Sequence, residues 1–228
     1  MIISHEHRFI FLKTEKTGSS SVESALGRFC GPRDILTVLH ESDEVSNPVG
    51  PRNDRVALGA VVAPPRGLRR VLPEAFGFYP HIRATQVRRM VPRQVWSGYF
   101  KFAVERNPWD RQVSLFRHRQ RRRPHLTFDK WLGNPLERSR HYVRLRNWNI
   151  YSIDGRLAVD HVIPYERLSE GLADVLQHLG LKERPALPRV NGQYRPADDS
   201  YRPHYNAANR QRVERWYRRE VETFDYSF

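Results

Sequence analysis

The sequence predicts an α/β fold, with a central, mainly parallel sheet that is flanked by helices. The first observation is an apolar run at 9–13, which leads into a hydroxyl-rich turn and then into helical periodicity. The second is the same order of strand, turn and helix at 100–116, where an Asn-Pro pair separates strand from helix. A third strand at 159–164 precedes another amphipathic helix. Strands that alternate with helices are typical of parallel sheets.

The segment at 11–21, FLKTEKTGSSS, has the composition of an anion-binding loop. Gly18 permits a tight turn, and the serines after it begin a helix, so hydroxyls and backbone N–H groups point at one place. With the Lys16 ammonium, these donors suit a phosphate or sulfate group. A nucleoside-triphosphatase loop has its lysine after the second glycine, whereas Lys16 precedes Gly18. An ordinary strand-to-helix turn with a solvated lysine explains this segment equally well when it is taken alone.

The segment at 102–116, FAVERNPWDRQVSLF, places polar residues where a strand ends. Open parallel α/β sheets bind ligands beyond the carboxyl ends of their strands, which is the position of Arg106. Asp110 and Ser114 are four residues apart and therefore share one face of the predicted helix. The run at 117–123 holds five arginines, which suits either a polyanion contact or a solvated helix end.

The other elements follow from capping and turn residues. Residues 31–67 are predicted to form a loop with one short strand near 56–62. Pro80 favours an extended chain before it, so we expect His81 at the end of a strand or loop, just before a helix. Further on we expect a short helix at 127–132, a hairpin around Asp154-Gly155, a helix at 170–179 capped by Ser169 and ended by Gly180, and a final helix capped by Asn206.

Composition limits the class of protein. A chain of 228 residues is long enough for one domain with a substantial core, and we expect a single domain over 1–228. Lys and Arg number 39 against 25 Asp and Glu, so the net charge of +14 indicates an anionic partner. The single cysteine, Cys30, excludes an intramolecular disulfide and is expected to pack in the interior. No signal peptide or apolar run of about 20 residues is present, so we expect a cytoplasmic protein without a transmembrane segment.

Taken together, the segments at 11–21 and 102–116 resemble the two cofactor motifs of the carbohydrate-type sulfotransferases, a family that includes heparan sulfate 2-O-sulfotransferase-like members and bacterial proteins. The resemblance continues at 159–168 and 201–228 and is weakest at 31–78, where an insertion that shapes the acceptor site is expected. It implies a sulfotransferase fold like that of the P-loop nucleoside triphosphatases. Glu15 departs from the proline that many members have at that place.

The resemblance also implies a cofactor and site residues. The donor would be 3′-phosphoadenosine 5′-phosphosulfate (PAPS), the product adenosine 3′,5′-bisphosphate, and no metal would be required. Arg106 and Ser114 would hold the 3′-phosphate. The loop around the 5′-phosphosulfate would consist of Lys16, Thr17, Gly18, Ser19, Ser20 and Ser21.

By the same resemblance, catalysis would be in-line transfer of a sulfuryl group to a hydroxyl. Lys16 would stabilise the departing phosphate, and His81 is similar in place to the general base of the heparan sulfate 2-O-sulfotransferase-like members. The alternative bases are His204, His161, His40, Glu41 and Glu105. The acceptor would be a glycan, glycolipid or metabolite of a bacterial cytoplasm, while the sequence does not predict an oligomeric state.

Two other functions compete with this interpretation. A kinase or other phosphotransferase would use the same strand, loop and helix, but it requires a lysine followed by Ser or Thr in the glycine pattern of a triphosphatase loop. A nucleic-acid-binding protein would explain the net charge. Against it, the sequence has no recognisable nucleic-acid motif and its basic residues are scattered over the chain, so no specific nucleic acid is expected.

Overall fold

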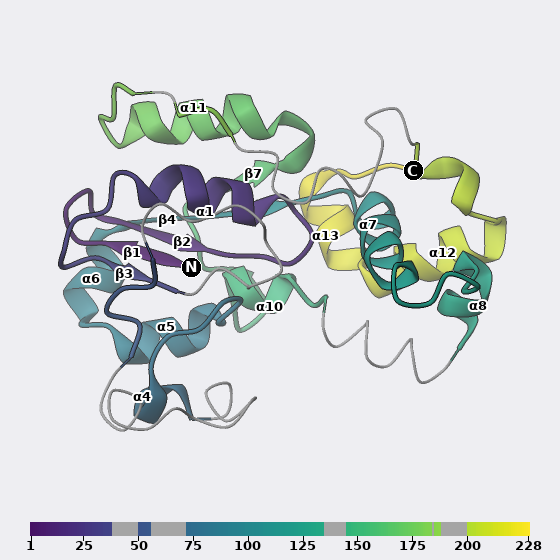
Figure 1. Ribbon diagram of the computed structural model, residues 1–228, viewed down its shortest axis with the longest axis horizontal. Coiled ribbons are helices and arrows are strands. Elements are labelled where there is room, and N and C mark those ends of the chain that lie inside the picture. Colours follow the sequence, from purple (N-terminus) through teal and green to yellow (C-terminus); the bar gives the residue numbers. More distant parts are fainter. Residues whose placement is uncertain (38–49, 56–71, 135–144, 184, 188–199) are drawn as a thin grey trace. The chain divides into compact units, whose positions relative to one another are not determined.

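The computed structural model describes residues 1–37, 50–55, 72–134, 145–183, 185–187 and 200–228 (Figure 1). The chain divides into two compact units. Unit 1 contains residues 1–105 and 149–190, and unit 2 contains residues 106–148 and 191–228. The strand predicted near 56–62 lies outside the described residues.

Unit 1 is built on a five-stranded sheet whose strand order is β3-β1-β2-β4-β7. Strand β4 pairs in parallel with β2 and β7, whereas β1 is antiparallel to both β2 and β3. Four of the five strands therefore run in the same direction, and the predicted mainly parallel sheet is confirmed. The strands are β1 (Ile2–Ser4), β2 (Phe9–Leu12), β3 (Ile35–Leu36), β4 (Phe100–Glu105) and β7 (His161–Pro164).

Helices cover both faces of this sheet. Helices α1 (Ser19–Gly27) and α11 (Leu168–His178) lie on one side, and α5 (Ala84–Met90) and α6 (Arg93–Gly98) lie on the other (Figure 1). The first side holds the main apolar core, to which the sheet contributes alternate residues because successive strand side chains point to opposite faces. This core contains Ile2, Phe9, Phe11, Val22, Ala25, Leu26, Leu36, Phe102, Val104, Ile163, Leu172, Val175 and Leu176.

The shorter elements of unit 1 test the predicted turns and caps. Strands β5 (Ser152–Ile153) and β6 (Arg156–Leu157) form the predicted hairpin, with Asp154 and Gly155 at φ 51° and 77°. Gly180, at φ 72°, follows α11 as predicted. The Ser169 cap is wrong, because a 3₁₀ turn over Tyr165–Arg167 leads straight into α11 and places its N-cap at residue 167. Helices α4 (Pro73–Phe76) and α10 (Trp148–Tyr151) complete the described elements around this unit.

In the described residues of unit 2, every regular element is helical. The N-caps are Asn107, Thr127 and Asn206, whose side chains accept hydrogen bonds from backbone N–H groups of the first turn. The predicted final helix is two helices, since Tyr217 (φ −116°, ψ 29°) interrupts it. The elements are α7 (Pro108–Gln120), α8 (Phe128–Gly133), the 3₁₀ turn Arg202–His204, α12 (Ala207–Trp216) and α13 (Arg218–Phe224).

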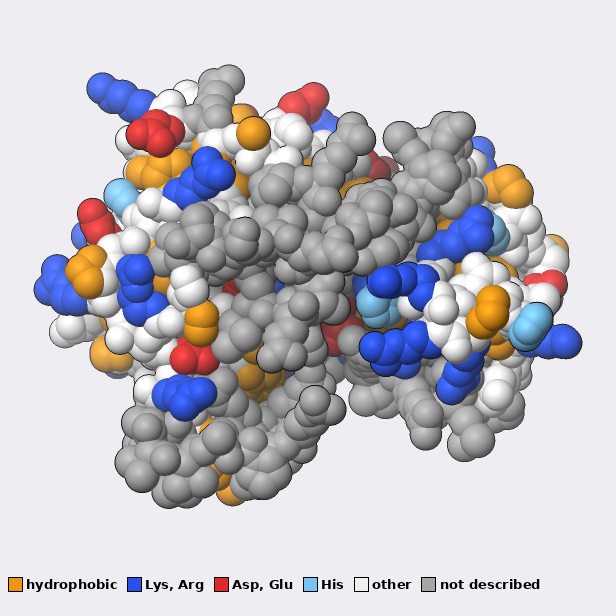
Figure 2. All heavy atoms as spheres, viewed as in Figure 1, with side chains coloured by type: hydrophobic (Ala, Val, Ile, Leu, Met, Phe, Trp, Pro, Cys, Tyr) orange, Lys and Arg blue, Asp and Glu red, His pale blue; other side chains and the backbone are white. Residues whose placement is uncertain are grey.

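The core of unit 2 is aromatic, and its surface is basic. Trp109, Phe116, Trp131 and Tyr217 are among the buried side chains of this core. Nineteen Lys and Arg residues belong to unit 2, against nine Asp and Glu, so most of the excess charge lies in this unit and not evenly along the chain. Figure 2 shows several Lys and Arg side chains gathered on the visible face of these helices.

Across the described part of the chain, no helix combines the length and apolar character needed to cross a membrane.

Candidate functional site

The loop between β2 and α1 reverses the chain through two left-handed residues. Lys16 has φ 62°, and Gly18, the N-cap of α1, has φ 72°. The carbonyl of Gly18 accepts hydrogen bonds from the N–H groups of Ser21 and Val22, at 2.9 and 3.3 Å. A helix start leaves its first N–H groups without intrahelical partners. The loop that contains Lys16 therefore leads directly into the positive end of the α1 dipole.

Gly18 also has no room for a side chain. A Cβ atom on Gly18 would lie 3.0 Å from the Leu168 side chain and 3.0 Å from the ring of Tyr165. Both residues belong to the segment that begins α11. The loop therefore packs against this segment at Gly18, whose left-handed backbone conformation also favours glycine.

Three hydroxyl groups meet beneath the loop. The Oγ1 atom of Thr14 lies 2.6 Å from the Thr17 hydroxyl and 2.9 Å from the Ser19 hydroxyl, and these last two are 2.6 Å apart. Thr14 also donates to the carbonyl oxygen of Val104 in β4, at 2.5 Å. All three side chains are buried. Of the predicted loop residues, Thr17, Ser19 and Ser21 are thus buried, while Lys16, Gly18 and Ser20 are half-buried.

A buried ion pair joins the start of the loop to α1. The Lys13 ammonium lies 2.7 Å from Oε2 of Glu23, and both side chains are almost fully buried. Burial by itself would raise the pKa of Glu23, but the Met1 ammonium and Lys13 beside it hold that pKa below its ordinary value. The pair fixes the start of the loop against the helix that follows it.

His81 lies in a turn before α5 and contacts the start of the loop. Its φ is 63°, in a turn where the Ile82 N–H donates to the Tyr79 carbonyl, and the predicted position just before the helix is confirmed. The Nδ1 atom lies 3.0 Å from the carbonyl oxygen of Lys13. Because a carbonyl only accepts, Nδ1 carries the proton in this hydrogen bond, and the lone pair of the neutral ring is then on Nε2.

The alternative candidates for the general base lie in different parts of the structure. His161 begins β7, and so lies toward the amino ends of the parallel strands, while the loop follows the carboxyl end of β2. Glu105 is fully buried and accepts a hydrogen bond from the Tyr151 hydroxyl at 2.7 Å. His204 belongs to unit 2, where its ring packs near two phenylalanines. His40 and Glu41 lie outside the described residues.

In unit 2, the second motif forms a polar face at the start of α7. Arg106 is buried, and its Nε atom donates to Oδ2 of Asp110 at 2.6 Å. This bond orients the guanidinium, whose two terminal nitrogens carry four further N–H donors. Ser114 follows one turn after Asp110 and is half-buried. The sequence places Asp110 and Ser114 on one face, but the bond from Arg106 to Asp110 emerges only from the structure.

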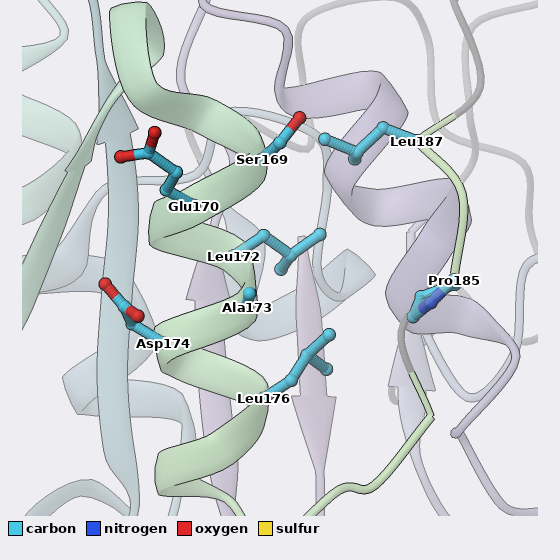
Figure 3. Close-up of a pocket in the computed structure, with 8 residues that line it drawn as sticks. All are labelled: Ser169, Glu170, Leu172, Ala173, Asp174, Leu176, Pro185 and Leu187. Carbon is cyan, nitrogen blue, oxygen red and sulfur yellow. The ribbon is translucent and has the colours of Figure 1, made fainter.

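Two further features lie apart from these residues. Cys30 is half-buried at the margin of the unit 1 core, against which it packs, and burial, with a further contribution from Asp34, raises the pKa of its thiol to about 12. A pocket of about 470 Å³ lies beside α11, where Leu172 and Leu176 point toward Leu187 (Figure 3). None of the predicted site residues lines it. Within the described residues, no group of three or more His, Cys, Asp or Glu side chains is placed to hold a metal ion.

Comparison with known proteins gives one family. The model of the "Sulfotransferase family" matches residues 1–227, nearly the whole chain. An uncharacterized protein of Archaeoglobus fulgidus is 31% identical over an alignment of 126 residues, and the match covers 52% of this chain and 96% of that protein. No solved structure matches the chain.

Proposed function

The chain belongs to the sulfotransferase family, and from this premise we propose that it transfers a sulfuryl group from PAPS to the hydroxyl of a glycan, glycolipid or small metabolite. The observation that carries the proposal is the loop before α1. There Lys16 and the left-handed Gly18 lead into a helix N-terminus lined by hydroxyl groups. A phosphate or phosphosulfate matches these donors in charge and in hydrogen-bonding chemistry.

In this proposal two groups of residues bind the two ends of the donor. The loop Lys16–Ser21 binds the 5′-phosphosulfate through its lysine, hydroxyls and backbone N–H groups. Arg106 and Ser114 bind the 3′-phosphate, and Asp110 keeps the Arg106 guanidinium in one orientation. When bound, the donor supplies the sulfuryl group and a phosphate leaving group.

The protein's own groups then perform two tasks. Nε2 of His81 accepts the proton of the acceptor hydroxyl as its oxygen bonds to sulfur. Support comes from the contact of Nδ1 with the Lys13 carbonyl, which in the neutral ring places the proton on Nδ1 and the lone pair on Nε2. The Lys16 ammonium neutralises the charge that develops on the phosphate oxygen when its bond to sulfur breaks. Neither task needs a covalent enzyme intermediate or a metal ion.

The family assignment supports several wider proposals. Because the match extends over residues 1–227, we propose that both units serve one sulfotransferase activity within a single domain. The strand, loop and helix at β2 and α1 support a fold like that of the P-loop nucleoside triphosphatases. Residues 31–78 are proposed to shape the acceptor site, although part of that range, β3, pairs with β1 at the edge of the sheet. The setting proposed for this activity is a bacterial cytoplasm.

Binding measurements separate this proposal from its rivals. Adenosine 3′,5′-bisphosphate, ATP with magnesium and a DNA duplex are titrated into the full chain under one salt concentration. The sulfotransferase proposal predicts clear preference for the bisphosphate. Preference for ATP would support a phosphotransferase, and salt-sensitive binding of the duplex with indifference to the bisphosphate would support a nucleic-acid-binding protein.

A further inference from the structure

We infer that Thr14 is a positioning residue of the phosphate loop: its hydroxyl ties Thr17 and Ser19 to β4 and so sets the loop for the 5′-phosphate. The inference rests on the proposed function of that loop. Thr14 itself lies outside the loop that the resemblance assigns, and its contact with Val104 joins residues 90 positions apart in the sequence.

The protons of the three hydroxyls can be assigned from the distances. The oxygen of Val104 is a carbonyl and can only accept, so the single hydroxyl proton of Thr14 is directed to it. Thr14 can then only accept from Thr17 and Ser19. Two protons remain for the three mutual contacts, which measure 2.6, 2.9 and 2.6 Å. At least one contact therefore contains no proton, and Thr17 and Ser19 supply any proton that the other two contacts hold.

This arrangement explains how buried hydroxyl groups can donate a hydrogen bond to a bound anion. An oxyanion at the loop can take the proton of Thr17 or of Ser19, because a charge-assisted hydrogen bond is stronger than the neutral bond that it replaces. The bond from Thr14 to Val104 stays in place during this exchange. Since β2 and β4 are neighbouring parallel strands, that bond anchors the cluster to the sheet.

The Thr14 methyl and hydroxyl groups can be separated experimentally. Thr14→Val keeps the shape and the β-branched stiffness but removes the hydroxyl, whereas Thr14→Ser keeps the hydroxyl and removes the methyl. Adenosine 3′,5′-bisphosphate and adenosine 3′-monophosphate differ only in the 5′-phosphate. Their affinities for the wild-type chain and both variants are measured by calorimetry, and circular dichroism confirms that each variant is folded.

The expected loss is specific to one ligand and one variant. Thr14→Val should bind the bisphosphate roughly 10-fold more weakly, the upper range for one hydrogen bond, while its affinity for the 3′-monophosphate stays within about 2-fold. Thr14→Ser should retain the wild-type preference. An equal loss for both ligands, or none for either, would overturn the positioning role. If Thr14→Val does not fold, Thr14→Ala takes its place in the same comparison.

Failure of the proposed function would look different. In that case the wild-type chain itself would bind the bisphosphate no better than the 3′-monophosphate. Such a result would overturn the assignment of the loop to a 5′-phosphate and the role of Thr14 with it. A wild-type preference that survives intact in Thr14→Val would overturn the role of Thr14 alone.

Discussion

Replacing His81 by glycine should strongly lower turnover without unfolding the protein. The left-handed conformation at φ 63° costs an ordinary residue about 1–2 kcal/mol, which glycine does not incur. Against this gain stand the lost hydrogen bond to the Lys13 carbonyl, worth about 0.5–1.5 kcal/mol, and the greater backbone entropy of glycine, about 0.5–1 kcal/mol. The free energy of unfolding should therefore change by no more than about 1.5 kcal/mol. Turnover should fall by roughly 10²–10⁴-fold, the contribution of a general base.

Asp154→Gly provides the matched control for this change. Asp154 is also a left-handed residue of unit 1, at φ 51°, but it lies in the β5–β6 hairpin. The free energy of unfolding is measured by urea denaturation, and turnover by release of adenosine 3′,5′-bisphosphate with PAPS and an acceptor found by screening. Asp154→Gly should keep full turnover, and added imidazole should partly restore His81→Gly. Turnover of His81→Gly within about 10-fold of the wild type would refute the base assignment.

Three further changes probe the loop and its support. Lys16→Ala should lower turnover by roughly 10²-fold or more, as for loss of one preorganised donor, whereas Lys182→Ala, which removes an exposed lysine of the same unit, should not change it. Gly18→Ala should destabilise the fold by about 1–2 kcal/mol in urea denaturation, because φ is 72° and the side chains of Leu168 and Tyr165 lie 3.0 Å from the position of the added Cβ. The same change should weaken binding of the bisphosphate. Unchanged binding would contradict the packing of the loop at Gly18. Glu23→Gln should cost about 3–5 kcal/mol at pH 7, since it leaves the Lys13 charge buried. Because the folded-state pKa of Glu23 is lowered, its contribution to the free energy of unfolding is present above about pH 4.5 and is lost as the pH falls through the folded-state pKa. Urea denaturation from pH 7 to 3 should therefore show the free energies of unfolding of the variant and the wild type converging.

The elements that local sequence determines could be predicted. β2, β4, α1 and α7 follow from apolar periodicity interrupted by glycine or proline, and Asn206 follows from capping chemistry. Strands β1 and β3 were missed, because runs of three and two residues carry no measurable period and form only by pairing with a neighbouring strand.

The loop residues were predicted, but their support was not. Thr14 contacts Val104, and His81 contacts Lys13, across separations of 90 and 68 residues, and no local pattern records such contacts. The bond from Arg106 to Asp110 is different, since their spacing of four residues was visible in the sequence and could have indicated it. The left-handed conformation of His81 was not predicted, because few residues other than glycine adopt a positive φ.

The central claim, that two separate groups of residues each bind one phosphate of the same adenosine, can be tested by calorimetry. Wild type, Lys16→Ala and Ser114→Ala are each titrated with adenosine 3′,5′-bisphosphate, adenosine 5′-monophosphate and adenosine 3′-monophosphate. We expect that wild type binds the bisphosphate most tightly, that Lys16→Ala loses the gain from the 5′-phosphate, and that Ser114→Ala loses the gain from the 3′-phosphate. Equal affinity of the wild type for all three nucleotides, or the same loss for every ligand in both variants, would contradict it.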